Sequence, residues 1–137
     1  MNKTLIERVI EKLQKYPHIK FDKLNENELE IHESDKNGFP ILLKKESTEY
    51  TLYFKAYHCH FDHTEDGENE LLDKLYLGLS GVGRIKEFSK NDKIYKSIFE
   101  LQDDREKWYD SGATVLLGVN FWTRPKIKYF QNHHLTN

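Results

Sequence analysis

The sequence predicts an α+β protein: a single two-layer domain in which a mainly antiparallel sheet is covered by two helices, in the order α-βββ-α-ββββ. Two segments repeat apolar residues at helical spacing, whereas the other apolar segments are short, tend toward period two and are separated by turn residues. Strands joined by short turns pair antiparallel, and two amphipathic helices can cover one face of such a sheet. Because 137 residues is the usual size of one domain, we expect residues 1–137 to form a single domain.

The first helix is predicted at about residues 5–15. Thr4 and Glu7 form a capping box, in which the hydroxyl and the carboxylate each accept a hydrogen bond from a backbone amide at the helix start. An apolar stripe follows at i, i+3, i+4 and i+7, made of Ile6, Val9, Ile10 and Leu13. Pro17 lacks the amide that would continue the helix, so the run ends near Tyr16.

Three strands are predicted between residues 25 and 62, where the apolar period changes toward two. The third of them, at about residues 50–61, bears on function. Successive side chains of a strand point to opposite faces, so Leu52 would share its face with His58 and His60.

A second helix is predicted after the acidic segment 64–69, with Asp66 as its N-cap and Gly81 at its end. Its apolar stripe consists of Leu71, Leu72, Leu75, Tyr76 and Leu79. Four further strands are predicted at residues 84–88, 93–102, 113–122 and 126–132. The chain is expected to close with a flexible tail at residues 131–137.

The composition indicates a solvated surface of mixed sign. Charged residues make up 32% of the chain, the formal net charge is -2, and the basic residues are dispersed among acidic ones. Phosphate binding needs a concentrated basic surface, so we expect no nucleic acid partner. We also expect no membrane association, because the sequence shows no signal-peptide pattern and no apolar run near the roughly 20 residues that span a bilayer. Cys59, the one cysteine, cannot form an intrachain disulfide, and we expect a cytoplasmic protein.

The segment HCHFDH, residues 58–63, is the strongest candidate for chemistry. It has the order H-x-H-x-D-H with which metallo-β-lactamase-type hydrolases hold two metal ions. Histidines at i and i+2 of a strand share a face and can bind one metal, and a bound metal lowers the pKa of its water to about 7. The segment therefore raises the alternative of a small zinc-dependent hydrolase that uses His58, His60, Asp62 and His63.

The similarity to metallo-β-lactamases covers these six residues alone. Those enzymes resemble a four-layer αββα sandwich with further ligands downstream, for which this chain is too short, and the segment 64–67 replaces the small residues that usually follow. Cys59 would point away from His58 and His60 on a strand, so a cysteine–histidine nucleophile is not expected either. We therefore favour a protein that is not an enzyme and has no catalytic residue or cofactor, in which the histidines are partly buried strand residues.

A second similarity covers about residues 50–132. It is carried by Tyr57–Asp62, Glu70–Leu72, Gly78–Ser80, Ile94–Lys96, Lys107-Trp108, Phe121-Trp122 and Tyr129–Asn132. With these segments the chain resembles a group of small uncharacterised bacterial α+β proteins that have an aromatic-H-x-H-F strand end and a closing F-W-x-[RK]…Y-[LF]-Q-N strand. The resemblance implies that HCHFD is a strand end. It implies no activity, but such proteins resemble accessory or immunity-type domains that bind another protein.

The sequence thus favours a non-enzymatic protein-binding or accessory domain. Trp108, Trp122 and Arg124 are residue types enriched at binding hot spots, although tryptophans in a domain of this size usually serve the core. The residues expected at a binding site are His58, His60, Trp122 and Arg124. A homodimer is a further alternative, since the acidic stretch 62–73 and the basic stretch 84–96 could complement each other, but charge runs usually only solvate a surface.

Overall fold

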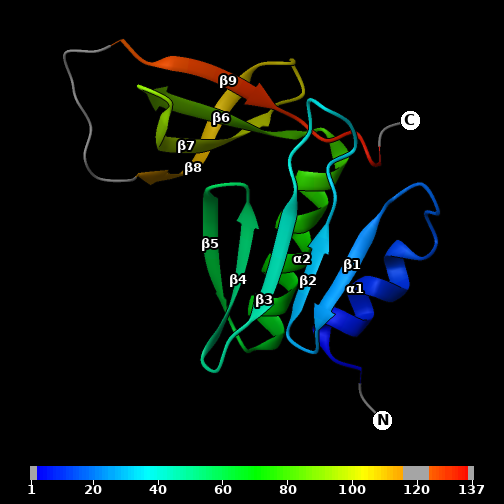
Figure 1. Cartoon of the computed structure of the whole chain (residues 1–137). Coiled ribbons are helices and arrows are strands. Elements are labelled where there is room, and N and C mark those ends of the chain that lie inside the picture. The colour runs from blue at the N-terminus through cyan, green and yellow to red at the C-terminus, as the bar shows by residue number, and fades with distance from the viewer. Residues whose placement is uncertain (1–2, 116–123, 136–137) are drawn as a thin grey trace.

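The α+β class predicted from the sequence is confirmed (Figure 1). The computed structural model describes residues 3–115 and 124–135, and this part of the chain contains two helices and nine strands in two antiparallel sheets. The elements are α1 (Leu5–Leu13), β1 (Phe21–Asn25), β2 (Glu28–Ile31), β3 (Ile41–Lys45), β4 (Glu49–Phe54), β5 (Tyr57–Asp62), α2 (Glu65–Ser80), β6 (Gly83–Lys90), β7 (Lys93–Gln102), β8 (Trp108–Val115) and β9 (Lys126–Phe130).

The strands β1 to β5 form a five-stranded sheet, sheet A, in chain order. Its register places fully buried apolar residues in rows across β2, β3 and β4. One row is Leu29, Leu43 and Leu52, and the next is Ile31, Ile41 and Phe54. The buried residues of α1 and α2 belong to the same core cluster as these rows, and Figure 1 shows α2 running along one face of the sheet. The opposite face of sheet A is called the open face below.

Both helices begin at a threonine. Thr4 Oγ1 accepts a hydrogen bond from the amide of Glu7 at 3.1 Å, which confirms the predicted start of α1. The N-cap of α2 is Thr64, and the prediction of Asp66 was wrong: Thr64 has an extended backbone, and its Oγ1 accepts from the amide of Gly67 at 3.0 Å. Asp66 instead lies in the first turn, where its negative charge is favourable.

The end of α2 needs two glycines for different reasons. Gly81 has φ 83°, the left-handed conformation that ends many helices, so the predicted helix end is confirmed. Gly78 lies so near β4 that an added Cβ would be 2.6 Å from the ring of Phe54. Neither of the two described helices, α1 and α2, has the length and apolarity needed to cross a membrane.

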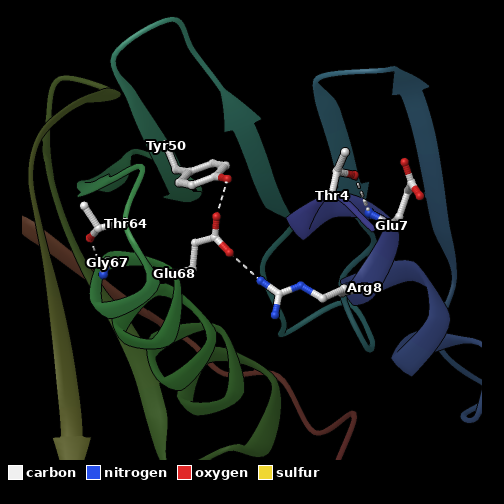
Figure 2. A network of polar contacts seen from close by, with 7 residues as sticks. All are labelled: Thr4, Glu7, Arg8, Tyr50, Thr64, Gly67 and Glu68. Atoms are coloured by element: carbon white, nitrogen blue, oxygen red, sulfur yellow. Dashed lines mark hydrogen bonds and ion pairs between the residues drawn. The ribbon is translucent and has the colours of Figure 1, made fainter. Parts of the chain in front are cut away.

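One carboxylate connects the two helices with sheet A. Glu68 of α2 accepts a hydrogen bond from Tyr50 Oη of β4 at 2.8 Å, and its other oxygen pairs with Arg8 of α1 (Figure 2). Burial and the hydrogen bond to Glu68 raise the pKa of Tyr50 to about 12, so the phenol stays protonated and remains a donor at neutral pH.

Five strands precede α2, whereas three were predicted from the sequence. The polar strand β1 was missed, and the predicted strand 50–61 is a hairpin of β4 and β5 with a two-residue turn at Lys55 and Ala56. Lys55 has φ 56°, a left-handed conformation that turn sequences normally signal with Gly, Asn or Asp. None of these residues occurs at the turn. The period-two pattern therefore predicted one uninterrupted strand through Lys55 and Ala56.

The hairpin changes which face the histidines occupy. Leu52 lies directly opposite Cys59, and Tyr53 lies opposite His58. Residues directly opposite each other in an antiparallel pair share a face, so Cys59 lies on the helix side with Leu52. His58 and His60 lie on the open face, and the prediction that they share a face with Leu52 was wrong. The prediction that Cys59 points away from both histidines is confirmed.

The strands β8, β7, β6 and β9, in that order, form a four-stranded sheet, sheet B. Its inner face carries Ile85, Phe99 and Phe130, which lie in or against the core cluster. Figure 1 shows sheet B lying across the end of sheet A, near the β4–β5 turn and the end of α2. At that turn, Lys55 Nζ lies 3.0 Å from Oε2 of the buried Glu87 and 3.8 Å from the ring centroid of Phe130. The opposite face of sheet B is called the outer face below.

The flexible tail predicted from residue 131 is wrong for residues 131–135. Asn132 is fully buried, and its Oδ1 accepts hydrogen bonds from the amides of Ser34 and Phe39 at 3.2 and 3.0 Å. Its Nδ2 donates to the carbonyl oxygen of Phe39 at 2.9 Å. These bonds offset the conformational entropy lost when the segment is ordered, and nothing in its polar sequence signals them. Residues 136–137 lie outside the described part of the chain.

The last two predicted strands are shifted in the structure. β8 begins at Trp108, five residues before the predicted start, and residues 116–122 of that prediction lie outside the described residues. β9 ends at Phe130, two residues before the predicted end.

Candidate functional site

His58 and His60 lie side by side on the open face of sheet A. Their ring centroids are 5.4 Å apart, and the ring of Tyr53 is 5.4 Å from that of His58. His60 Nδ1 lies 3.0 Å from Glu49 Oε2 and 3.0 Å from Thr51 Oγ1. His58 is half-buried, as expected for a strand residue, whereas His60 is exposed.

His63 is turned away from the other two histidines of the segment HCHFDH. Its ring lies 4.5 Å from that of Tyr50, which contacts Glu68 on the helix side of sheet A. Among residues 3–115 and 124–135, the one group of three potential ligand atoms within 4.8 Å of each other does not involve this segment. Metal binding by HCHFDH therefore stays a prediction. A metal site that used all three histidines and Asp62 would require the ring of His63 to move away from Tyr50.

The group that meets this distance consists of Asp22, Glu30 and His32 on the β1–β2 hairpin. Asp22 lies directly opposite Glu30, and His32 Nε2 is 2.6 Å from Asp22 Oδ2 and 3.9 Å from Glu30 Oε1. One imidazole and two carboxylates suit zinc or manganese. All three side chains are at least 41% exposed, and exposed acidic clusters commonly act as solvated surface, so we assign this group no function. The group could not be predicted from the sequence because β1, which carries Asp22, was not predicted.

Cys59 lies on the helix side of β5, near Tyr57 and Lys74. Burial raises the pKa of the Cys59 thiol, and the positive charge of Lys74 opposes that rise. Burial also raises the pKa of Tyr57, whose hydroxyl accepts a hydrogen bond from Lys74 Nζ at 2.9 Å. A thiol with a raised pKa is a poor nucleophile at neutral pH.

A groove of about 330 Å³ lies between α1 and α2. Its lining includes Tyr16 and Tyr76, which are 43% and 55% exposed, together with leucines of both helices. Lys12 and Asp73 are the charged residues of its described lining. A specific small-molecule site usually adds several converging polar groups to an apolar wall, and this groove offers few of them.

The outer face of sheet B brings aromatic and cationic side chains together. The guanidinium of Arg84 lies between two rings, 4.0 Å from the centroid of Trp108 and 4.2 Å from that of Tyr129. Its Nε donates to Glu100 Oε1 at 2.8 Å. The three stacked residues come from β6, β8 and β9, so sheet pairing assembles them from distant parts of the chain. Stacking and ion pairing together hold the guanidinium in one orientation.

A second cluster on the outer face adjoins the first. Lys86 Nζ lies 5.2 Å and Lys96 Nζ 5.5 Å from the ring centroid of Phe88. Phe88 is directly opposite Lys96 on β7 and Ile127 on β9, and Lys86 Nζ also lies 5.9 Å from the ring of Tyr129. Lys86, Phe88 and Lys96 are called the Phe88 clamp below.

The two parts of the chain differ in the sign of their charge. Residues 1–82, which include sheet A and both helices, contain 11 Lys and Arg against 16 Asp and Glu. Residues 83–137, which include sheet B, contain 10 against 7. The overall charge of -2 therefore hides a basic part that carries the outer face.

The predicted binding residues in the described part of the chain lie on different elements of the fold. Arg124 is exposed just before β9, and Trp122 lies outside the described residues. His58 and His60 lie on the open face of sheet A. Trp108 was named from the sequence, but Arg84 and Tyr129, which stack with it, were not. The recurrence of Arg84, Lys86 and Phe88 at period two along β6 was a signal that these three residues share a face.

Comparison of the chain with protein-family models, with curated proteins and with solved structures finds no match. The resemblance to small bacterial proteins therefore stays a prediction.

Proposed function

We propose that this protein is a non-enzymatic protein-binding domain and that its binding surface is the outer face of sheet B. The observation that carries the proposal is the stack of Trp108, Arg84 and Tyr129. Tryptophan, tyrosine and arginine dominate binding hot spots, and here all three share one face. Because the stack already orders Arg84, binding a partner costs little further side-chain entropy.

Exposed apolar surface beside the stack supports the same proposal. Tyr129 and Ile127 of β9 are 48% and 45% exposed, and Val115 of β8 is 61% exposed. The register places these residues on the same face as Arg84 and Lys96. A partner that covers them would remove their apolar surface from water, which is favourable by about 25 cal/mol per Å².

The partner is proposed to be a protein that this domain accompanies or neutralises, as an accessory or immunity-type domain would. A cytoplasmic location belongs to the same proposal. It is supported by the use of a single cysteine, Cys59, whose thiol is free.

The test compares two exposed tyrosines. The tagged protein is used to capture partners from a lysate of the organism that encodes it, in parallel with Tyr129→Ala on the outer face and Tyr76→Ala in the α1–α2 groove. We expect a protein captured by the wild type to bind Tyr129→Ala about tenfold more weakly or worse, and Tyr76→Ala equally well. Circular dichroism checks that both variants are folded. If only Tyr76→Ala lost the captured protein, the binding surface would be the α1–α2 groove. If all three proteins captured it equally, the outer face would be rejected as the binding surface.

A further inference from the structure

We propose that the partner presents an acidic segment whose carboxylates bind to Lys86 and Lys96 beside the ring of Phe88. The inference rests on the proposed function and adds the chemistry of the partner to it. Its basis is the charge, the packing and the ring contacts of the Phe88 clamp.

The two lysines of the clamp carry charge that no acid in the described chain neutralises. Within residues 3–115 and 124–135, neither Lys86 nor Lys96 forms an ion pair, whereas Arg84 on the same face pairs with Glu100. Both ammonium groups lie within 5.5 Å of the Phe88 ring centroid, so they flank the same ring. A bound anion would supply the countercharge that neither ammonium group has within the described chain.

The side chains between the two lysines are apolar. Ile98 lies opposite Lys86 in the register, is 5% exposed and lies outside the main core cluster. Phe88 and Ile127 lie opposite each other in the next row. An ion pair formed beside these apolar side chains is partly shielded from water, so the attraction between its charges is stronger. The surface therefore fits a segment in which acidic residues alternate with apolar ones.

The same contacts favour carboxylates of a protein over a nucleic acid. Proteins that bind single strands stack bases on open aromatic rings. On the outer face, the rings of Trp108, Tyr129 and Phe88 already have cations of the chain within 5.5 Å of their centroids. The exposed β-branched side chains of Ile127 and Val115 add surface that suits apolar side chains of a protein.

The experiment measures binding of two fluorescent polyanions by anisotropy at low salt. Poly-L-glutamate supplies carboxylates, and a 15-nucleotide oligothymidine supplies phosphates and bases. The test variant is Lys86→Gln with Lys96→Gln. The matched control is Lys44→Gln with Lys45→Gln on β3, which removes the same charge from sheet A, where Lys44 Nζ also lies near a ring, 5.7 Å from that of Tyr53.

We expect the wild type to bind poly-L-glutamate and the clamp variant to bind it about tenfold more weakly, while the control changes by less than about twofold. Absence of binding, or equal weakening by the clamp variant and the control, would overturn the inference. Tighter binding of oligothymidine, lost in the clamp variant, would also overturn it and make nucleic acid the ligand of this face.

The two proposals fail in different ways. If a captured partner protein is lost on Tyr129→Ala but binds the clamp variant as strongly as the wild type, the outer face remains the binding surface and the acidic segment is rejected. If Tyr129→Ala retains the partner, the proposed binding surface itself is rejected.

Discussion

Replacing Asn132 with alanine tests whether the residues after β9 are an integral part of the fold. The side chain has no exposed surface and makes four hydrogen bonds. Oδ1 accepts from the amides of Ser34 and Phe39, and Nδ2 donates to the carbonyls of Phe39 and, at 3.4 Å, of Gly78. One amide group thus joins the end of the chain to the loop before β3 and to α2.

The magnitude follows from the hydrogen bonds. Three of the four are 3.2 Å or shorter, and each contributes about 1 kcal/mol net. Alanine also leaves the amide and the carbonyl of Phe39 in the interior without this partner, and each unsatisfied buried group carries a further penalty. We expect Asn132→Ala to lower the free energy of unfolding by about 3–5 kcal/mol, a large share of the roughly 5–15 kcal/mol available to a domain.

Replacing Asn132 with aspartate separates the accepting and donating roles of the side chain. A carboxylate still accepts from both amides but turns negative oxygen toward the two carbonyls, which disfavours its charged form and raises its pKa in the folded state. A raised pKa contributes stability below the unfolded value near 4 and loses it as pH rises. The stability deficit of Asn132→Asp should therefore be smaller near pH 4 than at pH 7.

Urea unfolding followed by circular dichroism measures both effects. Asn69→Ala, at an exposed position of α2, is the matched control and should change stability by less than about 0.5 kcal/mol. If Asn132→Ala lowered the free energy of unfolding by less than about 1 kcal/mol, with an unchanged urea slope, the reasoning would be refuted. The residues after β9 would then not be an integral part of the fold.

Three further predictions concern titratable groups. The pKa of Tyr50 is raised to about 12 by burial and by Glu68, so stability is full below pH 10 and falls as pH rises toward 12; urea unfolding should show a smaller fall for Tyr50→Phe, and equal falls would contradict this. Burial lowers the pKa of His134, so its stabilisation is full above pH 6.5 and is lost as pH falls through that lowered value. Thermal unfolding between pH 7.5 and 4 should show a flatter acid limb for His134→Gln, and an unchanged limb would argue against the buried neutral ring. Burial raises the pKa of Cys59, so iodoacetamide should react slowly at pH 7; Lys74→Met, which removes a nearby positive charge, should slow it further, and a faster reaction would show the opposite balance.

The helices could be predicted because their signals are local. The hydroxyl of Thr4, the apolar stripe of α1 and Gly81 each act within a few residues of their own position. β1 carries one half-buried residue followed by exposed ones, so it shows no alternation that a period-two search would find. The turn at Lys55 was missed because its left-handed conformation is imposed by the pairing of β4 and β5 and is not signalled by a glycine.

The candidate site was only partly predictable. Trp108 and Arg124 could be named from residue type, since both types are common at interfaces. The contact of Arg84 with Trp108 and Tyr129 depends on the order β8-β7-β6-β9, which no local pattern specifies. The excess of basic over acidic residues in the second part of the chain could have been counted from the sequence. Only the fold of sheet B shows that some of these basic residues share its outer face.

The sequence by itself determined the α+β class, the two helices, the alternation of Cys59 with its neighbouring histidines and the mixed charge. These properties follow from capping, periodicity and composition, which act over a few residues. The tertiary structure alone decided that His58 and His60 lie on the open face, that Asn132 is buried and that the Phe88 clamp exists. Strand register and burial are set by residues far apart in the chain, because a side chain's face and exposure depend on which segment pairs with it.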